Sequence, residues 1–332
     1  MIRKLSYIES KETNPYRNLA VEEYLLLRCA EDECILYLWQ NANTVVIGRN
    51  QNIWKECIVN KLEDEKGYPV RRLSGGGAVY HDLGNLNFTF LVRKENYDVD
   101  RQLEVILTAV RKLGINAKKS GRNDILIDEH KFSGNAFYKQ GEYCYHHGTL
   151  MVDVNLGELS RYLTVSKEKL QAKGVDSVRS RVVNLKSYAP GLTIDQLKEK
   201  LRASFEEVYG LKARILEVSE LDKEEIRERT EKFSSWDWIY GRTLAFQYEL
   251  SKRFVWGQIT LQFQVKNGKV RDVNVFSDSM KPEFIEQLRG YLKNIRYDKH
   301  AICVELGLYW SSDKEEERMM ADIIEWIKTE DL

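Results

Sequence analysis

Three glycines in a row occupy positions 75–77, between the basic pair Arg71-Arg72 and a β-like run that begins at Val79. Glycine adopts backbone conformations that side chains forbid elsewhere, and its amides can approach a phosphate closely. This segment therefore predicts a loop. The neighbouring arginines favour a phosphate cradle, and a flexible turn is the alternative.

The loop matches neither of two common nucleotide-binding motifs. No Gly-Lys-Ser/Thr follows the glycines, as a Walker loop requires, and the spacing is not the G-x-G-x-x-G of dinucleotide folds. A phosphate site built on residues 71–85 therefore needs a different kind of anion-binding loop.

The charge balance argues against two classes of partner. The 332 residues include 51 Lys and Arg and 51 Asp and Glu, so no net field attracts nucleic acid or an anionic membrane. With 43% hydrophobic and 31% charged residues the composition is that of a globular protein, and the length suits one large domain and a smaller one. We expect a monomer.

Cysteine usage and the amino terminus predict a cytoplasmic protein. Residues 1–16 lack the apolar stretch of a signal peptide, and no run is long enough to cross a bilayer. The cysteines are odd in number and form no C-x-x-C pair, which argues against a disulfide framework and a zinc ribbon. They are Cys29, Cys34, Cys57, Cys144 and Cys303.

Capped and alternating segments predict a sheet-rich first domain. A helix is expected after Asn14-Pro15, since these residues favour a helix start. β-rich runs at 35–39 and 44–47, separated by a short turn, predict neighbouring strands. Further strands are expected at 86–90, at 124–127 and 131–138 as a hairpin, and at 143–154 beside it. A largely antiparallel sheet follows.

The later sequence predicts a covering helix and a second domain. Thr193 with Gln196 resembles a capping box, Gly210 is a suitable helix end, and the charged residues 217–232 are typical of a solvated helix face. Beyond the aromatic segment 236–241, two β runs, 254–265 and 269–276, meet at Asn267-Gly268, a strong hairpin signal. Helices are expected near 281–293 and 315–328. The predicted domains are 1–247 and 248–332.

Residues 71–85 (RRLSGGGAVYHDLGN) are similar to the adenylate-binding segment of the lipoate–protein ligase A family, within the biotin/lipoate ligase superfamily. Three further blocks resemble the same family in the same order, and the aromatic segment and terminal domain fit its bacterial two-domain form. The resemblance thus covers essentially the whole chain. These blocks are 121–125 with 131–136, 146–150, and 173–185.

The resemblance implies a fold and a reaction. The fold is α/β (α+β): a mixed, largely antiparallel sheet flanked by helices, related to the biotin-ligase and class II synthetase core, with a small C-terminal α+β domain. Lipoate and ATP with Mg²⁺ would give lipoyl-AMP and pyrophosphate. The lipoyl group would then pass to a lysine on apo lipoyl domains, namely the E2 subunits of 2-oxoacid dehydrogenases and the glycine cleavage H protein. No tightly bound cofactor is expected.

The resemblance also assigns roles. Lys131 is the catalytic cation, which would stabilise charge in both half-reactions rather than act as a covalent nucleophile. Asp124 is a candidate Mg²⁺ ligand, because carboxylate oxygens suit that ion. His81, His147 and Gly148 are candidates for lipoate binding. The remaining candidates for binding ATP or the adenylate are Arg72, Ser74, Gly75, Gly76, Gly77, Ala78, Val79, Tyr80 and Asn85.

The segment Cys144-Tyr145-His146-His147 offers no second ligand pair for a metal. On a strand, Cys144 and His146 would share one face and His147 would take the other, toward the site. The acyl chain needs an apolar slot, which Phe88 and Val46 could line. We expect the basic stretch 161–186 to close over the intermediate rather than to bind RNA.

The sequence leaves alternatives to the ligase open. An octanoyl- or lipoyl-transferase of the same superfamily would work through a thioester on Cys144, without ATP. A non-catalytic protein that binds lipoyl domains is a third reading. The glycine loop and Lys131 favour the ligase, and a biotin ligase is disfavoured because residues 71–85 contain no G-R-G-R loop.

Overall fold

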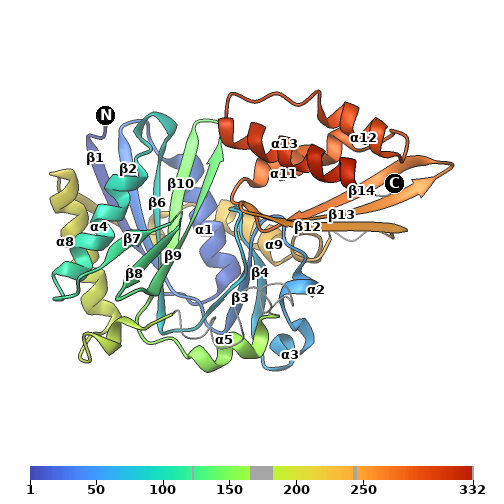
Figure 1. Cartoon of the computed structure of the whole chain (residues 1–332). Helices are drawn as coiled ribbons and strands as arrows, with labels where there is room; N and C mark the ends of the chain where they lie inside the picture. Colours follow the sequence, from blue (N-terminus) through green and yellow to red (C-terminus); the bar gives the residue numbers. More distant parts are fainter. Residues whose placement is uncertain (122, 165–181, 242–244, 331–332) are drawn as a thin grey trace. The chain divides into compact units, whose positions relative to one another are not determined.

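The computed structural model describes residues 1–121, 123–164, 182–241 and 245–330, and their contacts divide the chain into two compact units (Figure 1). The large unit contains residues 1–46, 54–71 and 78–235, and the small unit contains residues 47–53, 72–77 and 236–332. Residues 165–181 of the predicted basic stretch 161–186 lie outside the described residues, so its expected closure over the intermediate stays a prediction.

The main sheet of the large unit has eight strands: β1 (Lys4–Glu9), β2 (Glu33–Trp39), β6 (Asn85–Arg93), β7 (Lys118–Ser120), β8 (Asp124–Ile127), β9 (His130–Gln140), β10 (Tyr143–Met151) and β11 (Ala213–Glu217). Their order is β11-β1-β2-β6-β10-β9-β8-β7. β1 is parallel to β2 and β11, and the other pairs are antiparallel. The predicted mixed, largely antiparallel sheet and the β8–β9 hairpin are confirmed.

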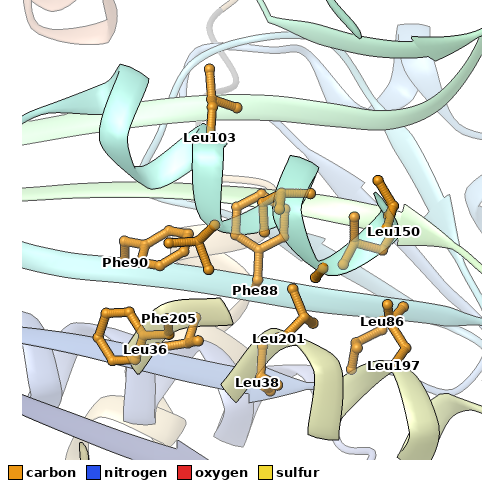
Figure 2. Close-up of a cluster of buried hydrophobic side chains, with 14 of the residues drawn as sticks. Leu36, Leu38, Leu86, Phe88, Phe90, Leu103, Leu150, Leu197, Leu201 and Phe205 are labelled. Atoms are coloured by element: carbon orange, nitrogen blue, oxygen red, sulfur yellow. The ribbon is translucent and has the colours of Figure 1, made fainter. Parts of the chain in front are cut away.

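Two helices, α4 (Val99–Arg111) and α8 (Ile194–Tyr209), cover one face of this sheet. The predicted capping box of α8 forms between Thr193 and Gln196, and Gly210 ends the helix at φ 68°. Figure 2 shows leucine and phenylalanine side chains from both layers packed into one core. They include Leu36, Leu38, Leu86, Phe88, Phe90, Leu103, Leu197, Leu201 and Phe205.

The helix α1 (Pro15–Arg28) packs against β2, β6 and β10, and α9 (Lys223–Ser234) packs on α1. The Asn14 side chain caps α1, as predicted, by accepting from two backbone amides. The charged segment 217–232 is only partly the expected helix, because its start completes β11 and a 3-10 turn, η3 (Val218–Glu220), follows. Two side chains of α9, Ile226 and Phe233, are buried.

A second sheet of three strands has the order β4-β3-β5: β3 (Thr44–Ile47), β4 (Tyr68–Arg71) and β5 (Val79–His81). The expectation that residues 35–39 and 44–47 form neighbouring strands is therefore wrong. β2 is paired on both sides, by β1 and β6, so no edge is left for β3. The connecting turn is fixed to the start of α1, since Ala42 N donates to Thr13 O at 3.1 Å.

The chain also forms several short helical elements. They are α2 (Ile53–Glu56), α3 (Val59–Asp64), α5 (Leu156–Tyr162), and the 3-10 turns η1 (Lys94–Asn96) and η2 (Leu185–Ser187). Within the described parts of the chain, no helix combines the length and the apolar character that a membrane crossing needs.

The small unit has a three-stranded antiparallel sheet and four helices among its described residues. The elements are α10 (Trp236–Ile239), β12 (Tyr248–Phe254), β13 (Gly257–Lys266), β14 (Lys269–Ser277), α11 (Pro282–Tyr291), α12 (Lys299–Leu306) and α13 (Lys314–Thr329). The predicted hairpin is confirmed, with Asn267 and Gly268 at φ 55° and 68°.

Two details of the small unit were not predicted. The predicted β run 254–265 is divided between two strands, because β12 ends at Phe254 and β13 starts at Gly257. Gly257 has a φ of 148°, a backbone conformation that would be strained in a residue with a side chain. Helix α12 was missed because only Ile302 and Leu306 of it are buried, which is too weak a pattern to detect.

Candidate active site

A cavity of about 290 Å³ lies in the large unit, and five of the predicted adenylate-binding residues meet in its wall. These five are Ala78, Val79, Tyr80, Asn85 and Lys131. The volume approaches that of a small-molecule site. The rest of the wall consists of Glu56, Gly134, Thr149, Met151, Leu156, Leu159, Leu163, Thr164 and Val182.

Lys131 reaches the cavity because β9 has one extra residue opposite β8. Asp124 of β8 lies opposite Gly134 of β9, and Leu126 lies opposite Lys131. The step from Asp124 to Leu126 is two residues on β8, whereas the step from Gly134 to Lys131 is three residues on β9. Along a regular strand Lys131 and Gly134 would face opposite sides of the sheet, and a bulge restores them to one side. Phe132, next to the lysine, is thereby directed into the buried core.

The position of Lys131 depends on a carboxylate that pairs with it and on a glycine that leaves space for its side chain. Its Nζ lies 2.7 Å from Asp124 Oδ1, and the two side chains are 32% and 36% exposed. The lysine crosses Gly134, where an added Cβ would lie 2.9 Å from Nζ. The Gly134 amide donates to Thr149 Oγ1 at 3.1 Å. The site therefore presents a positioned, accessible cation beside a carboxylate.

Tyr80 provides an aromatic part of the wall. Its ring centroid lies 5.5 Å from that of Tyr162, and its hydroxyl donates to Asn43 Oδ1 at 3.2 Å. Burial raises the pKa of Tyr80, so the phenol stays neutral at physiological pH. Asn85, also in the wall, donates to Asn87 Oδ1 at 3.0 Å.

The glycine loop, residues 72–77, is a part of the small unit, and Arg72 organises it from within. The guanidinium is buried and donates to Ser74 Oγ at 3.0 Å, to Gly75 O at 2.7 Å and to Gly77 O at 2.8 Å. The loop carbonyls therefore turn toward Arg72. Sequence reasoning predicted a phosphate contact for this arginine and did not foresee its role inside the loop.

Two of the glycines allow close backbone approach inside the small unit. The Gly76 amide donates to Ser279 O at 3.0 Å, with Gly76 at φ 91°. A Cβ on Gly75 would come 2.2 Å from the same carbonyl oxygen. Any larger residue at position 75 would displace this packing, whereas a side chain at Gly77 would meet open space.

His147 faces away from the core, as alternation predicted, and contacts helix α1. Its Nδ1 lies 2.8 Å from Glu22 Oε1, which also accepts from Thr89 Oγ1 at 2.7 Å. Trp39 Nε1 donates to Thr89 Oγ1 at 3.2 Å. All four side chains are buried. The sequence pointed to His147 but not to Glu22, Thr89 and Trp39, which complete this network and lie far apart in the sequence.

The other two lipoate candidates lie in different surroundings. His81 Nδ1 is 3.3 Å from Asn41 Nδ2, and the His81 ring meets Trp39 edge to face at 6.5 Å. Gly148 has no room for a side chain, because a Cβ would lie 2.7 Å from both Gly134 O and Phe88 Cζ. Gly148 thus permits the close approach of β9 and β10.

The prediction that Phe88 lines an apolar slot for the acyl chain is wrong, because Phe88 is fully buried in the core beneath α4 and α8 (Figure 2). The described cavity wall does not include Val46 either. Its apolar residues include Met151 and three leucines on or next to α5. Their spacing of three and four residues was a usable signal: Leu156, Leu159 and Leu163.

Cys144 is unsuited to the transferase alternative. It is 0% exposed, lies on the core face of β10 with His146, and burial raises its thiol pKa, whereas a nucleophilic thiol needs exposure and a lowered pKa. Among the described residues, no group of three or more His, Cys, Asp or Glu side chains is placed to hold a metal ion.

Comparison with known proteins agrees with this geometry. The model of the lipoyl protein ligase A/B catalytic domain matches residues 14–206, and that of the bacterial lipoate protein ligase C-terminus matches residues 243–327. A lipoate-protein ligase A of Bdellovibrio bacteriovorus is 39% identical over 336 aligned residues that cover 98% of each chain. This chain therefore belongs to the lipoate–protein ligase family, whose members ligate lipoate to proteins.

Solved structures agree with the assignment. LipL1 of P. falciparum, solved with lipoate, is 30% identical with a TM-score of 0.86, over 98% of this chain and 100% of that one. A lipoate-protein ligase A bound with ATP is 26% identical with a TM-score of 0.64, over 73% and 99%. A bipartite ligase of Thermoplasma acidophilum, described with its E2 lipoyl domain, is 28% identical with a TM-score of 0.65, over 75% and 100%.

Proposed function

We propose that this protein activates lipoate with ATP in the cavity of the large unit and then transfers the lipoyl group to a lysine of another protein. The observation that carries the proposal is Lys131, a cation paired with Asp124, in a wall whose other described residues are uncharged apart from Glu56. Such a wall suits a ligand with one charged centre and an apolar chain.

The reaction has two steps. A carboxylate oxygen of lipoate attacks the α-phosphorus of ATP, the bond to pyrophosphate breaks, and lipoyl-AMP forms. The acceptor amine then attacks the acyl carbon, the bond from that carbon to the adenylate oxygen breaks, and AMP leaves while the nitrogen loses a proton. The first step places negative charge on oxygens of the α-phosphate and of the leaving pyrophosphate, and the second places it on the acyl oxygen and on the oxygen that leaves with AMP.

Lys131 is the residue suited to that charge. An ammonium fixed by Asp124 needs little reorganisation when charge develops, which is how preorganised groups lower a barrier. Because the lysine keeps its proton in this role, it does not become acylated. The amide of Gly134 holds Thr149 beside it, and Asn85 offers a further polar contact.

The nucleotide is assigned to residues 72–80 with Asn85. Ala78, Val79 and Tyr80 line the cavity, and the neutral Tyr80 ring is suited to packing against adenine. Arg72, Ser74 and Gly75–Gly77 enter the proposal from the sequence motif. Arg72 fixes the conformation of this loop by donating to the carbonyl oxygens of Gly75 and Gly77.

Mg²⁺ is proposed to arrive with ATP and to use Asp124. The residues fit this reading, since one partly exposed carboxylate suits an ion that takes most of its ligands from phosphates and water. When bound, the ion would neutralise phosphate charge. It would share the Asp124 carboxylate with the Lys131 ammonium.

The lipoate chain is assigned to the apolar part of the wall, with His81, His147 and Gly148 as the candidates on the sheet side. His147 carries its own carboxylate partner, Glu22, so its ring orientation is set before a ligand binds. The acceptors are proposed to be apo lipoyl domains of E2 subunits and the H protein. The archaeal relative described with its E2 lipoyl domain supports this choice.

Pyrophosphate release tests the proposal. Purified protein with MgATP is assayed with and without lipoate and without any acceptor, for the wild type, Lys131→Ala and Cys144→Ser. We expect lipoate-dependent release that survives Cys144→Ser and falls by about 100-fold or more in Lys131→Ala. No lipoate-dependent release by the wild type would point to a transferase or a non-catalytic binder instead.

A further inference from the structure

A buried histidine that the proposed chemistry does not use lies behind the cation site. His146 is 0% exposed, on the core face of β10, with its ring 5.0 Å from that of Phe137 and 5.3 Å from that of Phe88. Polar groups so deeply buried need hydrogen-bond partners. His146 has two, one on helix α4 and one on strand β9.

The two partners fix how the ring is used. Nε2 lies 2.8 Å from Asn135 Oδ1, and Nδ1 lies 3.2 Å from Gln102 Oε1. Burial lowers the pKa of His146 to about 3, so the ring is neutral and has one N–H to donate. Asn135 already donates its own Nδ2, so its Oδ1 must accept the His146 N–H. Nδ1 is then an acceptor, and a half-turn of the Gln102 amide gives it a donor, because Gln102 Nε2 is buried and has no other hydrogen-bond partner among the described residues.

Asn135 connects the histidine to the segment that holds Asp124. Its backbone N and its Nδ2 both donate to Asn123 O, at 2.8 and 3.1 Å. In return, Asn123 Nδ2 donates to Asn135 O at 3.3 Å. The next residue, Asp124, is the partner of Lys131. A chain of hydrogen bonds therefore runs from the core of the sheet to Asn123, whose covalent neighbour Asp124 carries the carboxylate of the site.

We infer that His146 is a positioning residue: through Asn135 it fixes the Asn123-Asp124 backbone, and with it the carboxylate that pairs with Lys131. This inference rests on the proposed function of Asp124 and Lys131. These hydrogen bonds also explain why histidine occupies position 146, among aromatic core residues, where phenylalanine would pack at least as well. Without the His146 N–H, Asn135 Oδ1 would be buried and unsatisfied, and its side chain would turn away from Asn123.

A matched pair of variants separates positioning from packing. His146→Phe keeps the aromatic contacts and removes the donor, whereas His146→Gln restores an N–H near Nε2 at the expense of packing. We expect the phenylalanine variant to melt at a temperature no lower than the glutamine variant. In lipoate-dependent pyrophosphate release, the kcat of His146→Phe should nevertheless fall about 10-fold. The kcat of His146→Gln should lie much closer to the wild-type value.

Two further variants complete the test. Cys144→Ala, on the same strand and face, should lower the melting temperature without changing kcat. The double variant His146→Phe/Asn135→Ala should lose no more activity than the single Asn135→Ala, since both act along one path. Three results would overturn the inference and leave the proposed function standing. They are a wild-type kcat in His146→Phe, a kcat that follows the melting temperature across all the variants, and additive losses of kcat in the double variant. Absence of release by the wild type would instead refute the proposed function and this inference with it.

Discussion

Replacing Gly134 by alanine perturbs Lys131 with little effect on the fold. The new Cβ would lie 2.9 Å from Lys131 Nζ and 3.0 Å from Cε. Nonbonded heavy atoms rest at about 3.5 Å, so the ammonium must retreat by about 0.6 Å. The atoms that yield belong to the end of a flexible side chain, and the alanine needs no left-handed backbone at this position.

The magnitude follows from this displacement. An error of about 1 Å in a catalytic group can cost about 100-fold in rate, and we expect a fall in kcat of about 10-fold, or ~1.4 kcal/mol of barrier. Alanine at a compatible glycine position changes folding stability by less than about 1 kcal/mol. The variant should therefore be nearly as stable as the wild type and clearly slower.

The assay is lipoate-dependent pyrophosphate release, measured beside thermal unfolding. Gly148→Ala is the matched control, with the same chemical change on the adjacent strand. Its Cβ would lie 2.7 Å from both the Gly134 carbonyl oxygen and the Phe88 ring, which cannot yield easily. We expect it to lose about 1–3 kcal/mol of stability. A Gly134→Ala enzyme with wild-type kcat would refute the placement of Lys131 across Gly134.

Two further predictions concern stability. Thr193→Ala removes the capping box of α8 and should lower the free energy of unfolding by about 1 kcal/mol, measured by denaturant titration, with kcat unchanged; an unchanged midpoint would contradict the role of the cap. Burial, with smaller contributions from His147 and Lys119, lowers the pKa of His146 from 6.5 to about 3. Between these two pH values, His146 is protonated in the unfolded chain and neutral in the folded chain. Stability should then fall with decreasing pH by up to about 1.4 kcal/mol per pH unit, and His146→Phe should remove this component; parallel stability profiles for the two proteins would contradict it.

Local signals predicted the elements that depend on local physics. Asn14 caps α1, Thr193 and Gly210 bound α8, and Asn267-Gly268 forms its hairpin turn, because each is set by backbone conformation and nearby hydrogen bonds. The sheet in which a strand pairs is not local. β3 leaves its sequence neighbour β2 because β1 and β6 occupy both edges of β2, and no feature of residues 35–47 reveals this.

The site was predictable as motifs but not as geometry. The sequence pointed to Lys131 and Asp124, and the structure pairs them through a strand irregularity that alternation cannot foresee. Phe88 illustrates the converse, since the same β pattern that suggested a ligand slot belongs to a core strand. The membership of residues 72–77 in the small unit depends on contacts such as Gly76 N to Ser279 O, across about 200 positions of sequence.

The fate of the lipoate carboxylate oxygens tests the central claim most directly. Lipoate labelled with ¹⁸O in its carboxyl group is incubated with the enzyme, MgATP and an apo lipoyl domain, and the AMP released is examined by mass spectrometry. If the carboxylate attacks the α-phosphorus and the acceptor amine breaks the bond from the acyl carbon to the adenylate oxygen, one labelled oxygen is retained in AMP. AMP without label, or lipoylation of the acceptor without AMP formation, would contradict the proposed adenylate.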